Sequence, residues 1–454
     1  MLMKCYFLRL IEYLSLVFMV FIVPTSTFTK FTNIKGNIKG DISYINNDIT
    51  LKRSIIAMRC DDTMTMSKLT SKLVNDIDID IDDIDIDIDI DNPNPSPTVD
   101  LLGPINTPTV WSYFNNLTTT DTANLGQGFP DTPPPKFLTD SLKETIDSGY
   151  AIHQYTNPNG HPPLVKELMK RYSLHLHQPL TPSNVAITVG ASQALYLSLR
   201  TIVTPGSEVI IFEPFFDLYV NQVKLCGGKP RFVPLKLEGG RWNVDEDELA
   251  AALSPKTSCL ILNSPHNPTG KVFTYSEQLA ISLAILPYPS VKVLSDEVYK
   301  YIIHSPPPLP PSAPSTTVPG HTHFASLPGM YPRTITISSC GKTFSATGWQ
   351  VGWAVGPSSL IGPVQQVLPQ VQFCACSLAQ DALARALPQA DGPYEDEDGE
   401  VWDDYYVYLR ERYRSKRDLL AKALEEAGFD VPDYGGGGGG GGFGCVWCEW
   451  NLAR

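Results

Sequence analysis

Short apolar runs alternate with amphipathic segments from about residue 104 onward. Segments with helical spacing, such as 191–203 and 276–286, separate runs that are rich in Val, Ile and Leu. Such runs, alternating with helices, predict parallel strands that are buried on both faces. The expected strands are 184–190, 207–214, 230–236, 258–265, 291–299 and 333–339. We therefore expect an α/β fold whose mostly parallel sheet is covered by helices.

The first hundred residues show a different pattern. The apolar run at 13–24 follows Lys4 and Arg9 and is too short to span a bilayer comfortably, which is typical of a targeting segment. Glu12 at its edge weakens a signal-peptide interpretation, and a misassigned start codon is an alternative. Asp and Ile then alternate over 76–91, which would place a row of mutually repelling carboxylates on one face of a strand. This run is expected to be a disordered linker.

The amino-acid composition argues against several classes of function for this chain. The chain has 454 residues, of which 43% are hydrophobic and 18% charged, as in a globular protein. Its net charge of −13 argues against sequence-independent binding of nucleic acid, which needs a basic face. Nine cysteines are too few for a disulfide scaffold. The pairs Cys374/Cys376 and Cys445/Cys448 lack a matching pair of further Cys or His ligands, so we predict no metal site.

Polar side chains follow several of the expected strands, where ligands bind in parallel sheets. Lys342 stands in an otherwise uncharged stretch, where burial would lower the pKa of its amine and make it nucleophilic. A carboxylate such as Asp296 can keep a pyridine nitrogen protonated, and Tyr and Asn can bind a phenolic oxygen. A helix start with a hydroxyl binds phosphate. The strand-end set is Ala191, Ser192, Asn267, Asp296, Tyr299, Ser339 and Lys342, and it predicts a site for pyridoxal 5′-phosphate.

Several segments, in order, resemble the class I/II aminotransferases of fold type I, closest to the kynurenine aminotransferase / cysteine-S-conjugate β-lyase subgroup. They are NLGQGFPDTPPP (124–135), QYTNPNGHPPL (154–164), EVIIFEPFFDLY (208–219), NSPHNPTGKVF (263–273), SDEVY (295–299), ASLPGM (325–330) and CGKTFSATGWQVGW (340–353). The resemblance implies a fold type I transferase with a large domain and an incomplete small α/β domain. Its implied divisions are an N-terminal extension (1–103), an arm (104–130), a large cofactor-binding domain (131–375) and a partial small domain (376–454).

The resemblance also implies a role for each matching residue. Lys342 would bond covalently to pyridoxal phosphate and move protons, while Asp296 would pair with the ring N–H. Asn267 and Tyr299 would bind the ring oxygen, and Phe216 would stack on the ring. Ala191, Ser192 and Ser339 would hold the phosphate, together with Tyr155 of a neighbouring subunit. Trp111, Gly128 and, across the dimer, Phe373 would line the substrate pocket.

The implied activity is transfer of an amino group from an amino acid of kynurenine, glutamine, aromatic or sulfur type to a 2-oxo acid, with possible β-lyase activity. A homodimer with shared active sites is expected, without nucleic acid or a stable membrane span. The expected compartment is cytoplasmic or mitochondrial, although the apolar segment leaves a secretory route open. A catalytically impaired or non-catalytic protein of the same fold is the alternative.

Three departures from the family pattern motivate that alternative. The family has a basic residue near the phosphate where this chain has Gln350. A run of eight glycines at 435–442 replaces a short turn before a strand. The arginine that binds the substrate carboxylate in the family would lie beyond residue 454, so a C-terminally truncated chain is expected.

Two further segments are interpreted from composition. The Pro-rich stretch 305–320 is expected to be a surface insertion, with a ligand for SH3-type domains as the alternative. Residues 393–429 predict an acidic loop and then a long helix that stops at Gly428.

Overall fold

The computed structural model describes residues 128–304 and 318–426, Gly428, Val431, and the short strands β1 (Ile38–Lys39) and β2 (Asp85–Ile86). The chain divides into two units, 1–97 and 98–454. In the first unit, β1 pairs with β2 in antiparallel orientation, and β2 is the only described part of the Asp–Ile run. The predicted targeting segment and the rest of the predicted linker lie outside the described residues. Within those residues, no helix is long and apolar enough to cross a membrane.

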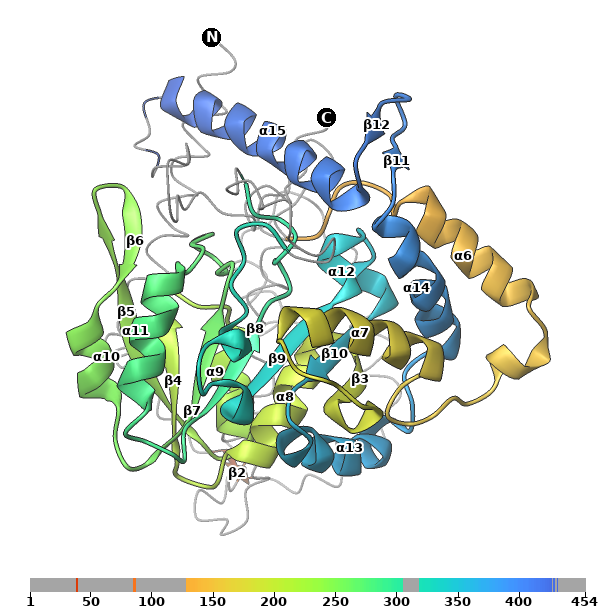
Figure 1. Ribbon diagram of the computed structural model, residues 1–454. Helices are drawn as coiled ribbons and strands as arrows, with labels where there is room; N and C mark the ends of the chain where they lie inside the picture. Colours follow the sequence, from red (N-terminus) through yellow and green to blue (C-terminus); the bar gives the residue numbers. More distant parts are fainter. Residues whose placement is uncertain are drawn as a thin grey trace. The chain divides into compact units, whose positions relative to one another are not determined.

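The second unit is built on an eight-stranded sheet with the order β3-β10-β9-β8-β7-β4-β5-β6 (Figure 1). Neighbours from β9 to β5 are parallel, whereas β10 is antiparallel to both β3 and β9, and β6 to β5. The strands are β3 (Val185–Val189), β4 (Glu208–Glu213), β5 (Lys229–Glu238), β6 (Arg241–Val244), β7 (Thr257–Asn263), β8 (Lys292–Asp296), β9 (Thr334–Ser339) and β10 (Val351–Val355). Every predicted strand is present, and the mostly parallel sheet is confirmed. The sequence analysis missed β6 and β10.

Alternate residues along the strands face two different apolar cores. Ile211, Ile261 and Ile337 pack with α8 (Gly190–Ile202), α9 (Leu218–Leu225) and α13 (Ser358–Gln372). On the opposite face of the sheet, the part that β4, β7 and β8 form packs against α10 (Glu246–Ala252) and α11 (Tyr275–Ile285). On the same face, the part that β3 and β10 form packs against α7 (Pro162–His175). The continuous apolar runs of the sequence are explained by this burial on both faces.

The remaining helices pack beside α7 and the end of β9. Helix α6 (Lys136–Asp147) contacts α14 (Ser377–Ala390), and α15 (Tyr405–Glu426) begins against the short helix α12 (Cys340–Thr343). There the rings of Tyr405 and Phe344 stack at 5.5 Å between centroids. Gly428 follows α15 with a φ of +89°, a conformation that favours glycine, so the predicted long helix and its stop are confirmed.

The segment before α15 differs from the prediction. It contains a small hairpin of β11 (Tyr394–Glu395) and β12 (Val401–Trp402) where an acidic loop was expected. The side chain of Asp396 closes the hairpin turn by accepting hydrogen bonds from the backbone N–H groups of Asp398 and Glu400. The carboxylate of Asp396 thus caps a turn as well as carrying charge. The poly-Gly run, and residues 305–317 of the Pro-rich stretch, lie outside the described residues.

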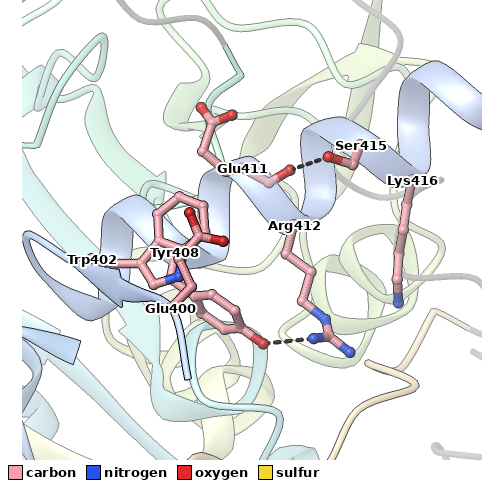
Figure 2. Close-up of a pocket in the computed structure, with 7 residues that line it drawn as sticks. All are labelled: Glu400, Trp402, Tyr408, Glu411, Arg412, Ser415 and Lys416. Atoms are coloured by element: carbon pink, nitrogen blue, oxygen red, sulfur yellow. Dashed lines mark hydrogen bonds between the residues drawn. The ribbon is translucent and has the colours of Figure 1, made fainter. Parts of the chain in front are cut away.

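A groove of about 420 Å³ lies between this hairpin and α15 (Figure 2). Trp402 and Tyr408 line it together with Arg412 and Lys416. Both cations already have partners, because Arg412 donates to the Tyr408 hydroxyl at 2.6 Å and to Glu397 at 2.8 Å, and Lys416 pairs with Asp131. We therefore assign no ligand to this groove.

Candidate active site

The strand order brings the predicted site residues to one edge of the sheet. The carboxyl ends of β3, β9, β8, β7 and β4 share this edge with the amino end of the antiparallel β10. The register places Asp296 opposite both Asn263 and Ile337, and Gly352 opposite both Ser339 and Thr188. The residues at or shortly after these strand ends are Ala191, Ser192, Phe216, Asn267, Asp296, Tyr299, Ser339 and Lys342. They therefore come from the ends of β3, β4, β7, β8 and β9.

Asp296 is the buried acid of this edge, with 4% of its surface exposed. Its Oδ2 accepts a hydrogen bond of 2.7 Å from the hydroxyl of Tyr219, and its Oδ1 accepts one of 3.3 Å from the backbone N–H of Val298. Burial raises the pKa of Asp296 to about 6 in spite of these two bonds. A buried carboxyl group in this state is suited to a cationic partner, such as a protonated ring nitrogen.

Tyr219 is a site residue that the sequence analysis missed. It lies on α9, and burial together with the Asp296 carboxyl raises its pKa well above the usual value. Tyr219 therefore stays protonated and acts as a hydrogen-bond donor to Asp296. It ends the quoted segment EVIIFEPFFDLY, so the resemblance itself contained the signal.

Lys342 lies on α12, directly after β9, and its side chain is half-buried. Its Nζ donates a hydrogen bond to the carbonyl oxygen of Gly128 and lies 5.6 Å from the centroid of the Tyr299 ring. Tyr299 itself is 5% exposed. The structure thus brings together three residues that the sequence analysis had assigned to one site.

The start of α8 forms the polar end of the same edge. Its Gly190 N–H donates to the carbonyl oxygen of Gln350 at 2.8 Å, next to Ala191 and Ser192. A Cβ on Gly352 would lie only 2.3 Å from the carbonyl carbon of Gly190, so β10 can approach the helix start only with glycine there. The other N–H groups of the first turn have no acceptor within the helix, which suits an anion.

Gln350, the departure from the family pattern, stands at this helix start. A Cβ added to Gly190 would lie 2.5 Å from Gln350 Oε1, so the amide group lies beside the first turn of α8. Its Nε2 donates to the carbonyl oxygen of Thr347 at 2.7 Å. The side chain at position 350 therefore lies beside the first turn of α8.

Asn267 and Phe216 are held at the edge through other residues. The backbone N–H of Asn267 donates to Asn263 Oδ1 at 2.6 Å, and Asn263 Nδ2 donates to the Asp296 carbonyl oxygen at 3.0 Å. The half-buried ring of Phe216 meets the ring of Tyr219 edge-on, at 5.7 Å between centroids. Both residues thus contact partners of Asp296.

Tyr155 and Phe373 lie on the surface. Tyr155 is 80% exposed and Phe373 53% exposed, and their ring centroids are 4.5 Å apart. Two large exposed aromatic rings in contact with each other are suited to burial against another surface. Trp111, the remaining predicted pocket residue, lies outside the described residues.

Pyridoxal 5′-phosphate fits the residues that this edge presents. The buried carboxyl group of Asp296 matches a pyridine N–H, and the start of α8 with the nearby hydroxyl groups of Ser192 and Ser339 matches a phosphate. The amine of Lys342 lies over the ring of Tyr299. Lys342 follows β9, which lies between β3 and β8 in the sheet and so between these two groups of residues. These are the charge and donor types that the cofactor requires.

The comparisons with known proteins agree with this fit. Residues 120–437 match the family described as aminotransferase class I and II. The kynurenine–oxoglutarate transaminase of Dictyostelium discoideum is 38% identical over 384 residues, which are 76% of this chain and 82% of that protein. Kynurenine–oxoglutarate transaminase 1 of Homo sapiens is 36% identical, over 68% of this chain and 71% of its own.

Solved structures give the same result. The N-succinyldiaminopimelate aminotransferase of Mycobacterium tuberculosis aligns with a TM-score of 0.63 at 35% identity, over 72% of this chain and 79% of its own. YbdL from Escherichia coli, for which a methionine aminotransferase function was identified, aligns with a TM-score of 0.60 at 32% identity, over 70% of this chain and 78% of its own. These matches do not favour the non-catalytic alternative. The chain therefore belongs to the class I and II aminotransferases, which use pyridoxal 5′-phosphate to move an amino group from an amino acid to a 2-oxo acid.

Proposed function

We propose that this aminotransferase takes the amino group of kynurenine, or of a related aromatic amino acid, and gives it to 2-oxoglutarate or a similar 2-oxo acid. The observation that carries the proposal is the strand-end set around Asp296 and Lys342 in a chain whose curated relatives are named kynurenine–oxoglutarate transaminases. The likeness to YbdL makes methionine the sulfur amino acid to compare with it.

The strand-end residues would hold the cofactor at three points. Asp296 would bind the ring N–H and, as an anion, keep that nitrogen protonated. Asn267 and Tyr299 would donate to the ring oxygen, and Phe216 would cover one ring face. The start of α8, with Ser192 and Ser339, would bind the phosphate, and Gln350 beside it would offer an amide where a cation is usual.

Lys342 would carry out the proton transfer. When bound, pyridoxal phosphate supplies an aldehyde that links to amino groups and a ring that accepts the electron pair left on the substrate α-carbon. Lys342 Nζ would take the proton from that carbon and deliver it to the carbon that belonged to the aldehyde group of the cofactor. Its bond to the Gly128 carbonyl oxygen would fix the amine before a substrate enters.

A homodimer belongs to the same proposal. Tyr155 would reach the phosphate of a neighbouring subunit, and Phe373 would enter that subunit's substrate pocket. Their exposure and mutual contact support a buried role in an assembly. The proposal keeps the predicted divisions, with an extension (1–103), an arm (104–130), a large domain (131–375) and small-domain residues (376–454).

The test of the activity uses the full chain supplied with pyridoxal phosphate. Kynurenine, phenylalanine, glutamine and methionine are each offered with 2-oxoglutarate, and glutamate formation is measured. Kynurenine should give the highest kcat/KM, and Lys342→Ala should lower it by a factor of at least about 10³, as expected for loss of the acid–base group. Borohydride reduction should label the peptide that contains Lys342. A label on another lysine would refute the site, and a clear preference for a non-aromatic donor would refute the substrate class.

The shared site is tested by mixing two inactive variants. Lys342→Ala and Tyr155→Ala are each expected to be nearly inactive as homodimers. A hybrid dimer combines an intact Lys342 in one subunit with an intact Tyr155 in the other, so co-expression should restore up to one functional site per hybrid. Recovery would be absent if Tyr155 served its own subunit. Pyruvate release from a cysteine S-conjugate, in the same preparations, tests the predicted β-lyase activity.

A further inference from the structure

The residue after Asp296 belongs to a different buried cluster, made of Glu297, His321 and His323. Glu297 Oε2 lies 3.2 Å from His321 Nε2 and 2.5 Å from His323 Nδ1. The two imidazole rings cross at 86° with 4.6 Å between their centroids. The side chains of Glu297, His321 and His323 are 1%, 0% and 7% exposed. One potential ligand atom from each of these three residues therefore lies within 4.8 Å of the other two, inside the protein.

This cluster leaves hydrogen-bonding capacity unused. Within the described part of the chain, neither ring nitrogen of His321, nor Nε2 of His323, has a hydrogen-bond partner. His321 Nε2 is close to the carboxylate of Glu297, but the two groups are not aligned as a hydrogen bond. Leaving a polar group buried without a partner costs about 1–3 kcal/mol. A buried imidazole without a hydrogen-bond partner therefore indicates a bound water molecule or ion.

We propose that Glu297, His321 and His323 form a binding site for one divalent transition-metal ion, of which zinc is the best match. Two imidazoles and one carboxylate are a ligand set that zinc accepts, whereas magnesium and calcium prefer oxygen ligands alone. With bonds of about 2.0–2.1 Å, tetrahedral ligand atoms lie about 3.3 Å apart. The distance from His321 Nε2 to Glu297 Oε2 is already close to this value. The distance from His323 Nδ1 to Glu297 Oε2 would need to lengthen by about 0.8 Å.

The surroundings of Glu297 resemble the outer shell of a metal site. Ser295 Oγ donates to Glu297 Oε1 at 2.8 Å, which leaves Oε2 for the histidines. Hydrogen bonds of this kind fix the orientation of a ligating carboxylate. The site would join the segment 321–323 to the end of β8 and so hold the strand that carries Asp296. A bound water molecule would complete the four ligands that zinc requires. We infer a structural role, because the protein ligands are closed off from solvent.

Lys300 is the charge that competes with a metal ion. It is 2% exposed, interacts electrostatically with Glu297, and donates to the Tyr172 hydroxyl at 2.6 Å. The Tyr172 ring lies 6.2 Å from the ring of His323. If Lys300 alone neutralises Glu297, no metal is needed and the cluster is a hydrogen-bonded network. The experiment must separate these two cases.

The experiment uses the full chain with its cofactor bound and without a histidine tag. After chelation and dialysis, the protein is equilibrated with excess Zn²⁺ and, separately, with Co²⁺. About one metal ion per chain should remain after gel filtration, and the cobalt form should show the intense visible bands of a four- or five-coordinate site. His321→Ala and Glu297→Gln should each reduce retained metal at least tenfold. The surface variant His153→Ala should retain the wild-type amount.

The cobalt spectrum of the wild-type chain decides the matter even if a variant fails to fold. Retained metal below about a tenth of an ion per chain, with no visible bands, would overturn the proposal and leave Lys300 as the partner of Glu297. Equal loss in His153→Ala and His321→Ala would also overturn it, since the metal would then be bound at the surface. Neither outcome depends on transaminase activity.

Discussion

The hydroxyl of Tyr219 donates a 2.7 Å hydrogen bond to the carboxylate of Asp296, and both side chains are buried. The bond joins helix α9, which follows β4, to the end of β8. It holds the carboxylate in one orientation and favours its ionised form. Tyr219 is therefore expected to be a positioning residue for Asp296, the group that we propose to pair with the cofactor ring.

Replacing Tyr219 by Phe should weaken cofactor binding. The change removes a hydrogen bond to an ionised group, which is worth about 1.5–3 kcal/mol, so the Kd for pyridoxal phosphate should rise by about 10- to 100-fold. Because the lost bond also lowered the pKa of Asp296, the pH at which the bound cofactor changes its absorbance should shift. Titration of cofactor-free protein and a pH series of spectra measure both effects. The control Tyr196→Phe, a half-buried position on α8, should change neither. Similar values in both variants would contradict the assigned role.

The stability of the cofactor-free protein should depend on the titration of Asp296. Folding raises the pKa of this carboxyl from 3.8 to about 6, because burial disfavours its charge. The folded state therefore holds the proton more tightly, so its stabilising effect is complete below about pH 4 and is lost as the pH rises through 6. The loss amounts to about 3 kcal/mol.

Asp296→Asn isolates this effect because it removes the titration and keeps the shape. Urea unfolding of cofactor-free protein at pH 4 and pH 7 should show that wild type loses about 2.4 kcal/mol more than the variant over this range, which covers most of the titration. Added pyridoxal phosphate should reduce the difference at pH 7, since a protonated ring nitrogen compensates the carboxylate. Parallel pH dependence of the two proteins would show that Asp296 does not titrate between these values.

The strands and most of the edge were predictable because their signals are local or carried by the resemblance. Buried strands give continuous apolar runs, and Asp296 ends one of them while Lys342 follows another by three residues. Strand β10 was missed because Val351–Val355 is only five residues long and contains Gly352, which weakens the signal of a strand. Its pairing between β3 and β9 depends on residues that are far apart in the chain.

Contacts between side chains of distant segments could not be derived from the sequence. The Tyr219–Asp296 bond joins residues 77 positions apart, and periodicity gives no sign of it. His321 and His323 follow a Pro-rich stretch, where the composition predicts a surface loop. Their burial beside Glu297 depends on where β8 ends and on how the following segment returns to it.

Gly352→Ala should damage the start of α8. A methyl group there would meet the Gly190 carbonyl carbon at 2.3 Å and the Ala191 nitrogen at 2.5 Å, and backbone atoms cannot move aside as a side chain can. Overpacking of this kind typically costs about 1–3 kcal/mol, and the displaced helix start should also bind phosphate less well. Unfolding by urea and cofactor titration test the two effects. Gly348→Ala is the control, because nothing lies within 4 Å of its added methyl group. Equal stability of the two variants would mean that β10 does not approach α8 this closely.

Gln350→Arg should tighten cofactor binding. Gln350 stands beside Gly190 at the start of α8, where a cation would meet a phosphate that carries nearly two negative charges. Its φ is +51°, and Arg has the same Cβ constraint as Gln, so the exchange should add no backbone strain. A charge-assisted contact in place of a neutral one should contribute about 1–2 kcal/mol, which lowers the Kd for pyridoxal phosphate about 5- to 30-fold.

Gln350→Glu provides the control of opposite sign for this prediction. A carboxylate at the same position should repel the phosphate and raise the Kd, while the fold and the length of the side chain stay nearly the same. The gap between the Arg and Glu variants should narrow as salt is added, because the interaction is electrostatic and the site is partly open to solvent. If both variants bind the cofactor as the wild type does, Gln350 does not face the phosphate. The departure from the family pattern would then have no consequence for cofactor affinity, and the helix start with its hydroxyl groups would account for phosphate binding.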